Sequence, residues 1–243
     1  AQTHVEIALA AVEADKHTLI EKPLALSLDG CDALIRRADE SSCKVMVGFN
    51  MRWHRLVKEA RAMIDSNQLG PLVAMRYVAT SQYRDREQAW LERRGLGGGM
   101  LIEFAVHVFD LWRFMLRSEV VEVYANSRTG RWEDETATIT ARMASGVLTT
   151  ALLSKGTGEN HEIEFYGEKG RVRLCRYRWD GLRVHQASTR PFGLRHRLRG
   201  AVQTVKAFPG AIPSIRQGGD LVASFEAEWR EFIAAVLQEG KVG

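Results

Sequence analysis

Residues 17–50 read HTLIEKPLALSLDGCDALIRRADESSCKVMVGFN, and this stretch decides the fold class. Its ends, residues 17–20 and 44–50, are short apolar segments typical of buried strands. Between them Ser27 is a typical N-cap for a helix, and apolar side chains at helical spacing over residues 4–15 predict an earlier helix. Helices that alternate with buried strands indicate βαβ units and a parallel sheet.

The rest of the chain predicts a different kind of sheet, because its strand-like runs follow one another with only short turns between them. Such runs form antiparallel pairs. Helices are predicted over about 56–66, 100–116 and 221–238, strands over 72–81, 120–127, 136–143, 147–154, 161–166, 171–177 and 182–185, and irregular structure over 187–219. We therefore predict an α/β chain with a partial parallel sheet in residues 1–51. Residues 52–243 are predicted to be an α+β domain with an open, mostly antiparallel sheet.

The composition is that of a globular protein: 243 residues with 34 Lys+Arg, 30 Asp+Glu and 45% hydrophobic residues. This composition excludes the disordered, collagen-like and coiled-coil classes. Three cysteines (Cys31, Cys43 and Cys175) cannot form a full disulfide framework, and their spacing fits no metal site. A reducing, cytoplasmic setting is therefore expected. The sequence holds no apolar run of the roughly 18 residues that a membrane span needs, so no membrane partner is predicted.

Positive charge is concentrated in residues 171–206, which hold nine arginines and one lysine against one acidic residue. Such a stretch is found in nucleic-acid-binding proteins. It is also found on solvated sheet faces and on surfaces that attract anionic ligands. We favour the second interpretation, with no nucleic-acid partner, because the window contains no recognisable nucleic-acid-binding motif.

Residues 21–23, EKP, follow the first predicted strand at the place where open α/β sheets bind ligands. A lysine in that position can exchange protons near neutral pH if burial or a neighbouring cation lowers its pKa. The alternative is a surface Lys22 paired with Glu21. Asn50 and Arg52 follow the second strand and lie at the same predicted edge.

The predicted helix 100–116 is apolar nearly all round, yet it carries Glu103, His107 and Asp110. Glu103 and His107 are four residues apart and share one face of an α-helix. A carboxylate beside an imidazole fixes its tautomer and raises its basicity, as acid–base catalysis requires. The alternative is a core histidine satisfied by a bridging acid. The HExxH pattern is absent and no third ligand is evident, so no metal is predicted.

A glycine-rich run, residues 95–99, leads into this helix. It is not a dinucleotide-binding loop, because it follows a charged loop and Met100 stands where the last glycine would fall. We predict a flexible entry that lets the backbone approach a ligand. Trp90 and Arg94, just before it, could close over a substrate or cofactor, or belong to an ordinary loop. Four other histidines are interpreted as structural or surface residues: His4, His161, His185 and His196.

Four motifs together resemble the Gfo/Idh/MocA family of NAD(P)-dependent oxidoreductases. In chain order they are H-x-E-I-A-x-A-A-x-E-A at 4–14, EKP at 21–23, V-G-F-N-x-R at 47–52 and G-G-G-x-L-x-E-x-x-x-H-x-x-D at 97–110. The resemblance implies an N-terminal Rossmann domain and a C-terminal domain whose open sheet forms a homo-oligomer interface. It also implies hydride exchange between NAD or NADP and a carbon of a sugar, cyclitol or related polyol.

The resemblance also implies roles for individual residues. Lys22 matches the catalytic lysine, His107 the general acid–base, and Glu103 a position where Asp is commonest; these three would also bind the substrate. Asp110 would be structural or would orient His107. The cofactor would be contacted by Glu21, Lys22, Asn50, Arg52, Trp90 and Arg94.

Family chains normally begin with a strand, a G-x-G-x-x-G loop and a helix, followed by an acid for the ribose. Those features are not in this sequence, so the resemblance implies that residues 1–51 are the C-terminal part of a Rossmann domain. Residues 52–243 would be the C-terminal domain. Without the phosphate-binding loop we expect cofactor binding to be lost or impaired in this form. Two alternatives stay open: a non-catalytic assembly module, and an NAD-dependent glycosidase.

Overall fold

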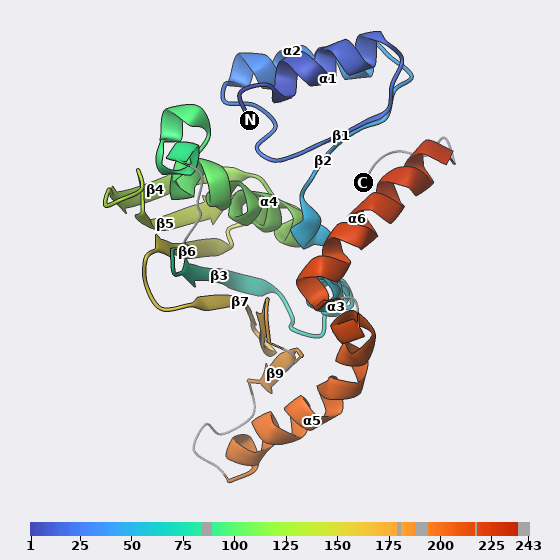
Figure 1. Ribbon diagram of the computed structural model, residues 1–243. Coiled ribbons are helices and arrows are strands. Elements are labelled where there is room, and N and C mark those ends of the chain that lie inside the picture. Colours follow the sequence, from blue (N-terminus) through green and yellow to red (C-terminus); the bar gives the residue numbers. More distant parts are fainter. Residues whose placement is uncertain (84–88, 179–180, 188–193, 217, 238–243) are drawn as a thin grey trace.

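The computed structural model describes residues 1–83, 89–178, 181–187, 194–216 and 218–237. Its strands form two separate sheets, one small and one large (Figure 1). The small sheet has two strands and the large one seven. Nine strands, six α-helices and several short helical turns make up these ranges. The α-helices are α1 (His4–Glu13), α2 (Leu28–Asp39), α3 (Arg55–Asp65), α4 (Ala105–Leu116), α5 (Leu194–Arg216) and α6 (Asp220–Leu237).

The small sheet is parallel, as the alternation of helices and strands predicted. Its strands β1 (Thr18–Ile20) and β2 (Val45–Val47) pair in parallel. Ser27 caps α2 by accepting a hydrogen bond from the backbone N–H of Gly30 at 3.2 Å, which satisfies one of the free donors at the helix start. A separate small core joins the two helices to the sheet: Ala8, Val12, Ile20, Leu34 and Cys43.

The large sheet has the strand order β4-β5-β6-β3-β7-β8-β9. Its strands are β3 (Leu72–Ser81), β4 (Val120–Arg128), β5 (Thr136–Met143), β6 (Leu148–Lys155), β7 (Asn160–Gly167), β8 (Gly170–Cys175) and β9 (Arg183–Gln186). The prediction of an open, mostly antiparallel sheet is confirmed. Strand β3 is inserted between β6 and β7 and runs parallel to β6, with Ser81 opposite Lys155 at the shared end.

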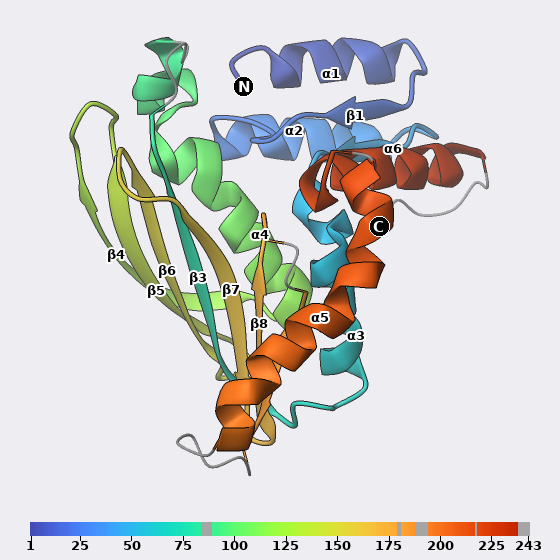
Figure 2. The same ribbon diagram turned by 60° about the horizontal axis from the view of Figure 1, so that its bottom comes forward.

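Helices α3 and α4 contribute to the core on one face of the large sheet, and α4 lies across it (Figure 2). Leu111 and Trp112 of α4 are at most 1% exposed in this core, which also contains Tyr77 and Phe165 of the sheet. On the other face, side chains of β4 and β6 are open to solvent: Tyr124, Leu148 and Leu152.

Residues 187–219, predicted to be irregular, contain helix α5, so that prediction is wrong. It rested on prolines as helix breakers, and Pro209 and Pro213 both lie inside the helix. Tertiary packing outweighs the local preference here: Ala211 is fully buried, and the side-chain amide of Gln203 donates to the backbone carbonyl of Val184 in β9 at 2.8 Å.

The helix predicted over residues 100–116 begins with a π-helical turn, Met100–Phe104, before α4. The glycine run before it was predicted to let the backbone approach a ligand. In the structure, Gly98 and Gly99 of this run pack closely against other backbone of the chain. A side chain at Gly98 would collide with the backbone carbonyl of Leu91, and one at Gly99 would lie 2.8 Å from the carbonyl oxygen of Glu133.

Replacing Gly99 by alanine is expected to lower the free energy of unfolding by about 3 kcal/mol. Its φ of 73° and ψ of 153° belong to a region that only glycine adopts readily, and the added methyl group would meet Glu133. Urea denaturation measures the loss. Gly146→Ala is the matched control, because Gly146 also has a positive φ, 87°, but open space around it. It should cost about 1 kcal/mol. Equal losses would contradict the steric contribution at Gly99.

Two arginines of the basic stretch form ion pairs between neighbouring strands. Arg171 and Arg173 of β8 pair with Glu164 and Glu162 of β7, each at 3.2 Å. All four side chains lie on the face of the sheet opposite the core. This supports the solvated-sheet interpretation for these two arginines. The basic stretch also includes residues 179–180 and 188–193, which lie outside the described residues.

Candidate active site

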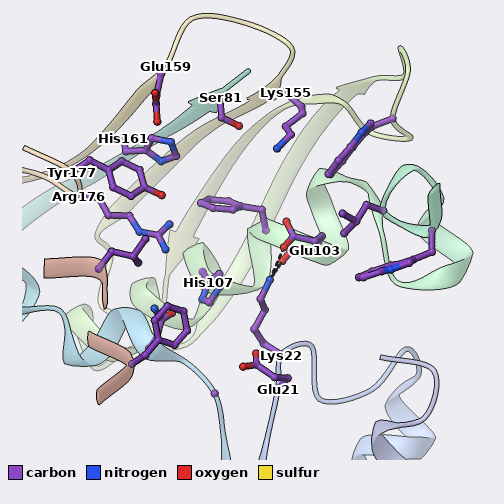
Figure 3. Close-up of a pocket in the computed structure, with 18 residues that line it drawn as sticks. Glu21, Lys22, Ser81, Glu103, His107, Lys155, Glu159, His161, Arg176 and Tyr177 are labelled. Atoms are coloured by element: carbon purple, nitrogen blue, oxygen red, sulfur yellow. Dashed lines mark hydrogen bonds and ion pairs between the residues drawn. The ribbon is translucent and has the colours of Figure 1, made fainter. Parts of the chain in front are cut away.

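A cavity of about 830 Å³ lies where the carboxyl ends of β1 and β2 meet the start of α4 and the ends of the large sheet's strands (Figure 3). Parallel strands bring the loops that follow them to one edge, and this is where open α/β sheets bind ligands. Residues at the strand ends of both sheets therefore line the cavity. Six residues of the predicted site line it: Glu21, Lys22, Asn50, Trp90, Glu103 and His107.

Lys22 is held at the centre of this cavity by Glu103. Its ammonium group donates to the backbone carbonyl of Glu103 at 2.6 Å and to Oε1 of the same residue at 2.8 Å. The lysine side chain is 15% exposed. His4 Nδ1 donates to the backbone carbonyl of Pro23, the residue after Lys22, at 2.8 Å. This hydrogen bond helps to fix the backbone beside Lys22. The lysine is thus oriented with its positive charge matched by a carboxylate.

His107 is 6% exposed and lies beside the cavity between two aromatic rings. The ring centroids of Phe49 and Phe104 lie 6.2 and 5.9 Å from that of the imidazole. Burial, followed by the charges of Lys22 and Arg176, holds the pKa of His107 well below its usual range. Its Nδ1 is buried and has no hydrogen-bond partner among the described residues. The imidazole is therefore neutral at neutral pH and can accept a proton.

The predicted pairing of Glu103 with His107 does not occur. Glu103 pairs with Lys22 instead, because the π-helical turn that contains it departs from the α-helical spacing on which the prediction rested. Asp110 does not orient His107 either. Its carboxylate accepts from Arg52 Nε at 3.0 Å and from Arg52 Nη2 at 2.6 Å. The structural interpretation of Asp110 is the one that its contacts support.

The other predicted cofactor residues divide into two groups. Asn50, buried at the cavity wall, donates from Nδ2 to the hydroxyl of Ser224 at 3.0 Å, and Trp90 lies at the rim with 38% of its surface exposed. Arg52 and Arg94 do not line the cavity. Arg52 forms the pair with Asp110, and Arg94 forms a 3.4 Å ion pair with Asp134. Their cofactor roles remain predictions from the sequence.

The far wall of the cavity is built by residues that the sequence did not single out as a site. They lie at strand ends of the large sheet: Ser81 and Lys155 end β3 and β6, Glu159 and His161 lie at the start of β7, and Arg176 and Tyr177 follow β8. His161 was interpreted as structural or at the surface; it is 7% exposed and lines the cavity. No sequence signal joined these residues, because β3 lies far from β6 to β8 in the chain and only the strand order brings their ends together.

Helix α6 places a buried carboxyl group, Glu228, near the cavity. The residue is 3% exposed, and its Oε1 has no hydrogen-bond partner among the described residues. Burial, followed by repulsion from the charge of Glu21, raises the pKa of Glu228 to about 7. The group is therefore partly protonated at neutral pH, and its ionisation opposes folding.

Glu228→Gln is expected to flatten the pH dependence of stability. The pKa of Glu228 is higher in the folded state, about 7, than its ordinary value of 4.5, so the folded state binds the extra proton and stability falls as pH rises between these values. Relative to wild type, the variant should gain about 2 kcal/mol between pH 5 and pH 8. Urea denaturation at both pH values measures this. Glu226→Gln, an exposed change on the same helix, should show no such gain; an equal gain there would exclude burial as the cause.

Within the described residues, no group of three or more His, Cys, Asp or Glu side chains is arranged to hold a metal ion. None of the described helices combines the length and the apolar character that crossing a membrane requires.

Two family models match the chain. The model described as "Oxidoreductase family, NAD-binding Rossmann fold" matches residues 1–49, and the "GFO/IDH/MocA C-terminal domain" matches residues 57–173. Together they cover more than half of the chain. They also follow each other in the order that the four sequence motifs predicted.

Curated relatives and solved structures agree with these models. Myo-inositol 2-dehydrogenase of Thermotoga maritima is 30% identical over 179 residues, which are 70% of this chain and 52% of that protein. A 1-carboxy-3-chloro-3,4-dihydroxycyclohexa-1,5-diene dehydrogenase of Comamonas testosteroni is 31% identical over 68% of this chain and 38% of that protein. The structure of levoglucosan dehydrogenase in complex with NADH and levoglucosan is similar in fold, with a TM-score of 0.75 and 21% identity, over 100% of this chain and 70% of that one.

The chain thus spans about half the length, or less, of these curated relatives. Both parts of the family pattern are nevertheless present, with the parallel strands matched by one model and the strands from β3 to the start of β8 by the other. The chain belongs to the Gfo/Idh/MocA family of oxidoreductases.

Proposed function

We propose that the protein is an NAD(P)-dependent dehydrogenase that acts on a hydroxyl or carbonyl carbon of a sugar, a cyclitol or a related polyol. The observation that carries this proposal is the combination of a carboxylate-paired Lys22 and a neutral, buried His107 in one cavity at the carboxyl ends of two parallel strands. In this proposal residues 1–51 belong to the cofactor domain, and residues 52–243 form the substrate and oligomerisation domain.

The cavity fits the nicotinamide end of the cofactor. Glu21 and Gly48, at the ends of β1 and β2, line it together with Asn50. Gly48 has no side chain, so this part of the cavity wall is backbone that a flat ring can approach. We assign Glu21, Lys22 and Asn50 to this end of the cofactor. The loops after β1 and β2 are not glycine-rich phosphate loops, so these residues account for the nicotinamide end only.

The two central residues would divide the proton chemistry between them. When bound, nicotinamide supplies the hydride acceptor or donor for the reacting carbon. Neutral His107 would accept the proton of the substrate hydroxyl during oxidation and return it during reduction. Lys22, paired with Glu103, would donate a hydrogen bond to the oxygen that becomes the carbonyl. The rings of Phe49 and Phe104 make the surroundings of His107 apolar at this end of the cavity.

The test is a panel of polyols incubated with the 243-residue chain and either NAD or NADP, followed by the absorbance of the reduced cofactor. Because the sequence predicts impaired cofactor binding in this form, the cofactor is supplied in large excess. We then expect slow turnover of at least one sugar or cyclitol, and weak binding of the reduced cofactor in a fluorescence titration. Failure to bind either cofactor, with no turnover of any polyol, would contradict the proposal for this chain. A fluorogenic glycoside that is cleaved only when NAD is present would instead favour the glycosidase alternative.

We further propose that the protein forms homo-oligomers through the large sheet. Support comes from its open face, where Tyr124 is 67% and Leu148 55% exposed. Apolar side chains on an uncovered sheet mark association surfaces. The expected location is the cytoplasm, a proposal supported by three free cysteines, Cys31, Cys43 and Cys175.

A further inference from the structure

Arg176 is the one arginine among the described residues that line the cavity, and it is buried there. It directly follows β8, and Figure 3 shows it on the wall that faces His107. The residue is 8% exposed, and its Nε is buried without a hydrogen-bond partner among the described residues. None of the carboxylates that the structure describes forms an ion pair with it. Burying a guanidinium without a counter-ion is costly, and a bound ligand that supplies the opposite charge would offset this cost.

The backbone of Arg176 is fixed on both sides. Its N–H donates to the carbonyl of His161 at 3.0 Å, and its own carbonyl accepts from Nε2 of His54 at 3.2 Å. His54 is completely buried, and burial lowers its pKa to about 4, so this contact persists in its neutral form across the physiological pH range. The position of the guanidinium is therefore set before any ligand arrives.

The side chain of Arg176 is oriented by aromatic rings. The guanidinium carbon lies 5.8 Å from the ring centroid of Phe104 and 5.4 Å from that of Tyr177. Such cation–π contacts orient the group but do not neutralise its charge. The aromatic rings thus fix the orientation of the guanidinium plane, and with it the direction of the Nε–H bond. Bidentate recognition of an oxyanion requires such a fixed orientation.

None of the three described carboxylates that line the cavity forms an ion pair with Arg176. Glu103 is paired with Lys22, Glu159 is exposed on the same wall as Arg176, and Glu21 follows β1. A second cation, Lys155, lines the same wall, with its ammonium group 4.9 Å from the ring centroid of Trp132. The far wall thus carries a buried positive charge beside the place where the proposed chemistry occurs.

We propose that Arg176 binds an anionic group, a carboxylate or a phosphate, on the polyol that the cavity takes. The substrate class would then be sugar acids or sugar phosphates rather than neutral polyols. This inference rests on the proposed function, because it concerns the substrate of the same cavity. A bound anion would also offset the charge that Arg176 exerts on His107 and so make the imidazole a stronger base in the complex.

The test compares ligands that differ at one carbon. Glucose, glucuronate and glucose 6-phosphate are titrated by calorimetry into the 243-residue chain, with and without NADH. We expect at least one of the two anions to bind more tightly than glucose, and their relative affinity distinguishes carboxylate from phosphate. In Arg176→Gln that anion should bind about 10- to 100-fold more weakly, while Arg176→Lys should recover part of the loss.

Arg173→Gln is the matched control, because it removes the same charge from the outer face of β8, where Glu162 keeps an ion pair with Arg76. Its affinity for the anions should equal that of wild type, and thermal unfolding of all variants reports whether they fold. Binding of neither anion, equal affinity for glucose and the anions, or an Arg176→Gln variant that keeps the preference would overturn the inference. If Arg176→Gln does not fold, the Arg176→Lys affinities decide the question.

The outcomes separate this inference from the proposed function. Turnover of neutral polyols without any preference for anions would leave the dehydrogenase function standing and reject the role of Arg176. Arg176-dependent binding of an anion without reduction of NAD or NADP would support the anion site and reject the dehydrogenase function.

Discussion

Lys22→Met should lower kcat for the proposed dehydrogenation by about 100- to 10,000-fold, the range expected when a positioned acid–base group is removed. Methionine keeps the length and volume of the lysine stem but removes the ammonium group that donates to Glu103. The developing carbonyl would lose its hydrogen-bond donor, and Glu103 would lose its counter-ion. The rate of cofactor reduction under saturating substrate measures the effect.

A second readout of Lys22→Met does not depend on turnover. The charge of Lys22 is one of the causes that lower the pKa of His107, after burial. Removing it should raise that pKa, which NMR titration of the histidine ring can follow. Lys16→Met makes the same chemical change at an exposed position and should leave both kcat and the imidazole unaffected. If Lys22→Met retains the wild-type rate, Lys22 has no part in the reaction.

Arg52→Met should lower the free energy of unfolding by about 3 kcal/mol, because it leaves the carboxylate of Asp110 buried without its partner. The side chain of Asp110 is 5% exposed, and burial already raises its pKa despite the opposing effect of Arg52. Because the pKa of Asp110 is raised, ionisation of this carboxyl group lowers the free energy of unfolding as pH rises. The deficit of Arg52→Met should therefore be larger at pH 7 than at pH 4. Urea denaturation at both pH values is the measurement.

The double variant Arg52→Met/Asp110→Leu should recover most of that loss, since replacing both members of a buried pair by apolar residues is often nearly neutral. Arg113→Met provides the control, because the Arg113–Glu119 pair is exposed on both sides and should be worth less than about 1 kcal/mol. If Arg52→Met weakened NADH binding and left stability unchanged, Arg52 would be a cofactor residue, as the sequence motif implies.

Much of the site could be predicted because it follows from local sequence patterns. Lys22 follows an apolar strand, and its position at the edge of a parallel sheet was predictable from the alternation of helices and strands. His107 was identified as a polar residue on an apolar helix. The pairing of Glu103 was not predictable, because Glu103 lies in a π-helical turn, where α-helical spacing does not hold.

The sequence by itself determined the two kinds of sheet, the elements of the chain up to β9, and the residues Glu21, Lys22 and His107 as candidates for chemistry. These are consequences of short-range periodicity and of turn residues, which act within a few positions of the chain. The tertiary structure alone decided that Arg52 pairs with Asp110 and that Arg176 faces His107. Insertion of β3 between β6 and β7 brings distant segments to one cavity wall, and the charges that meet there depend on packing across the whole chain.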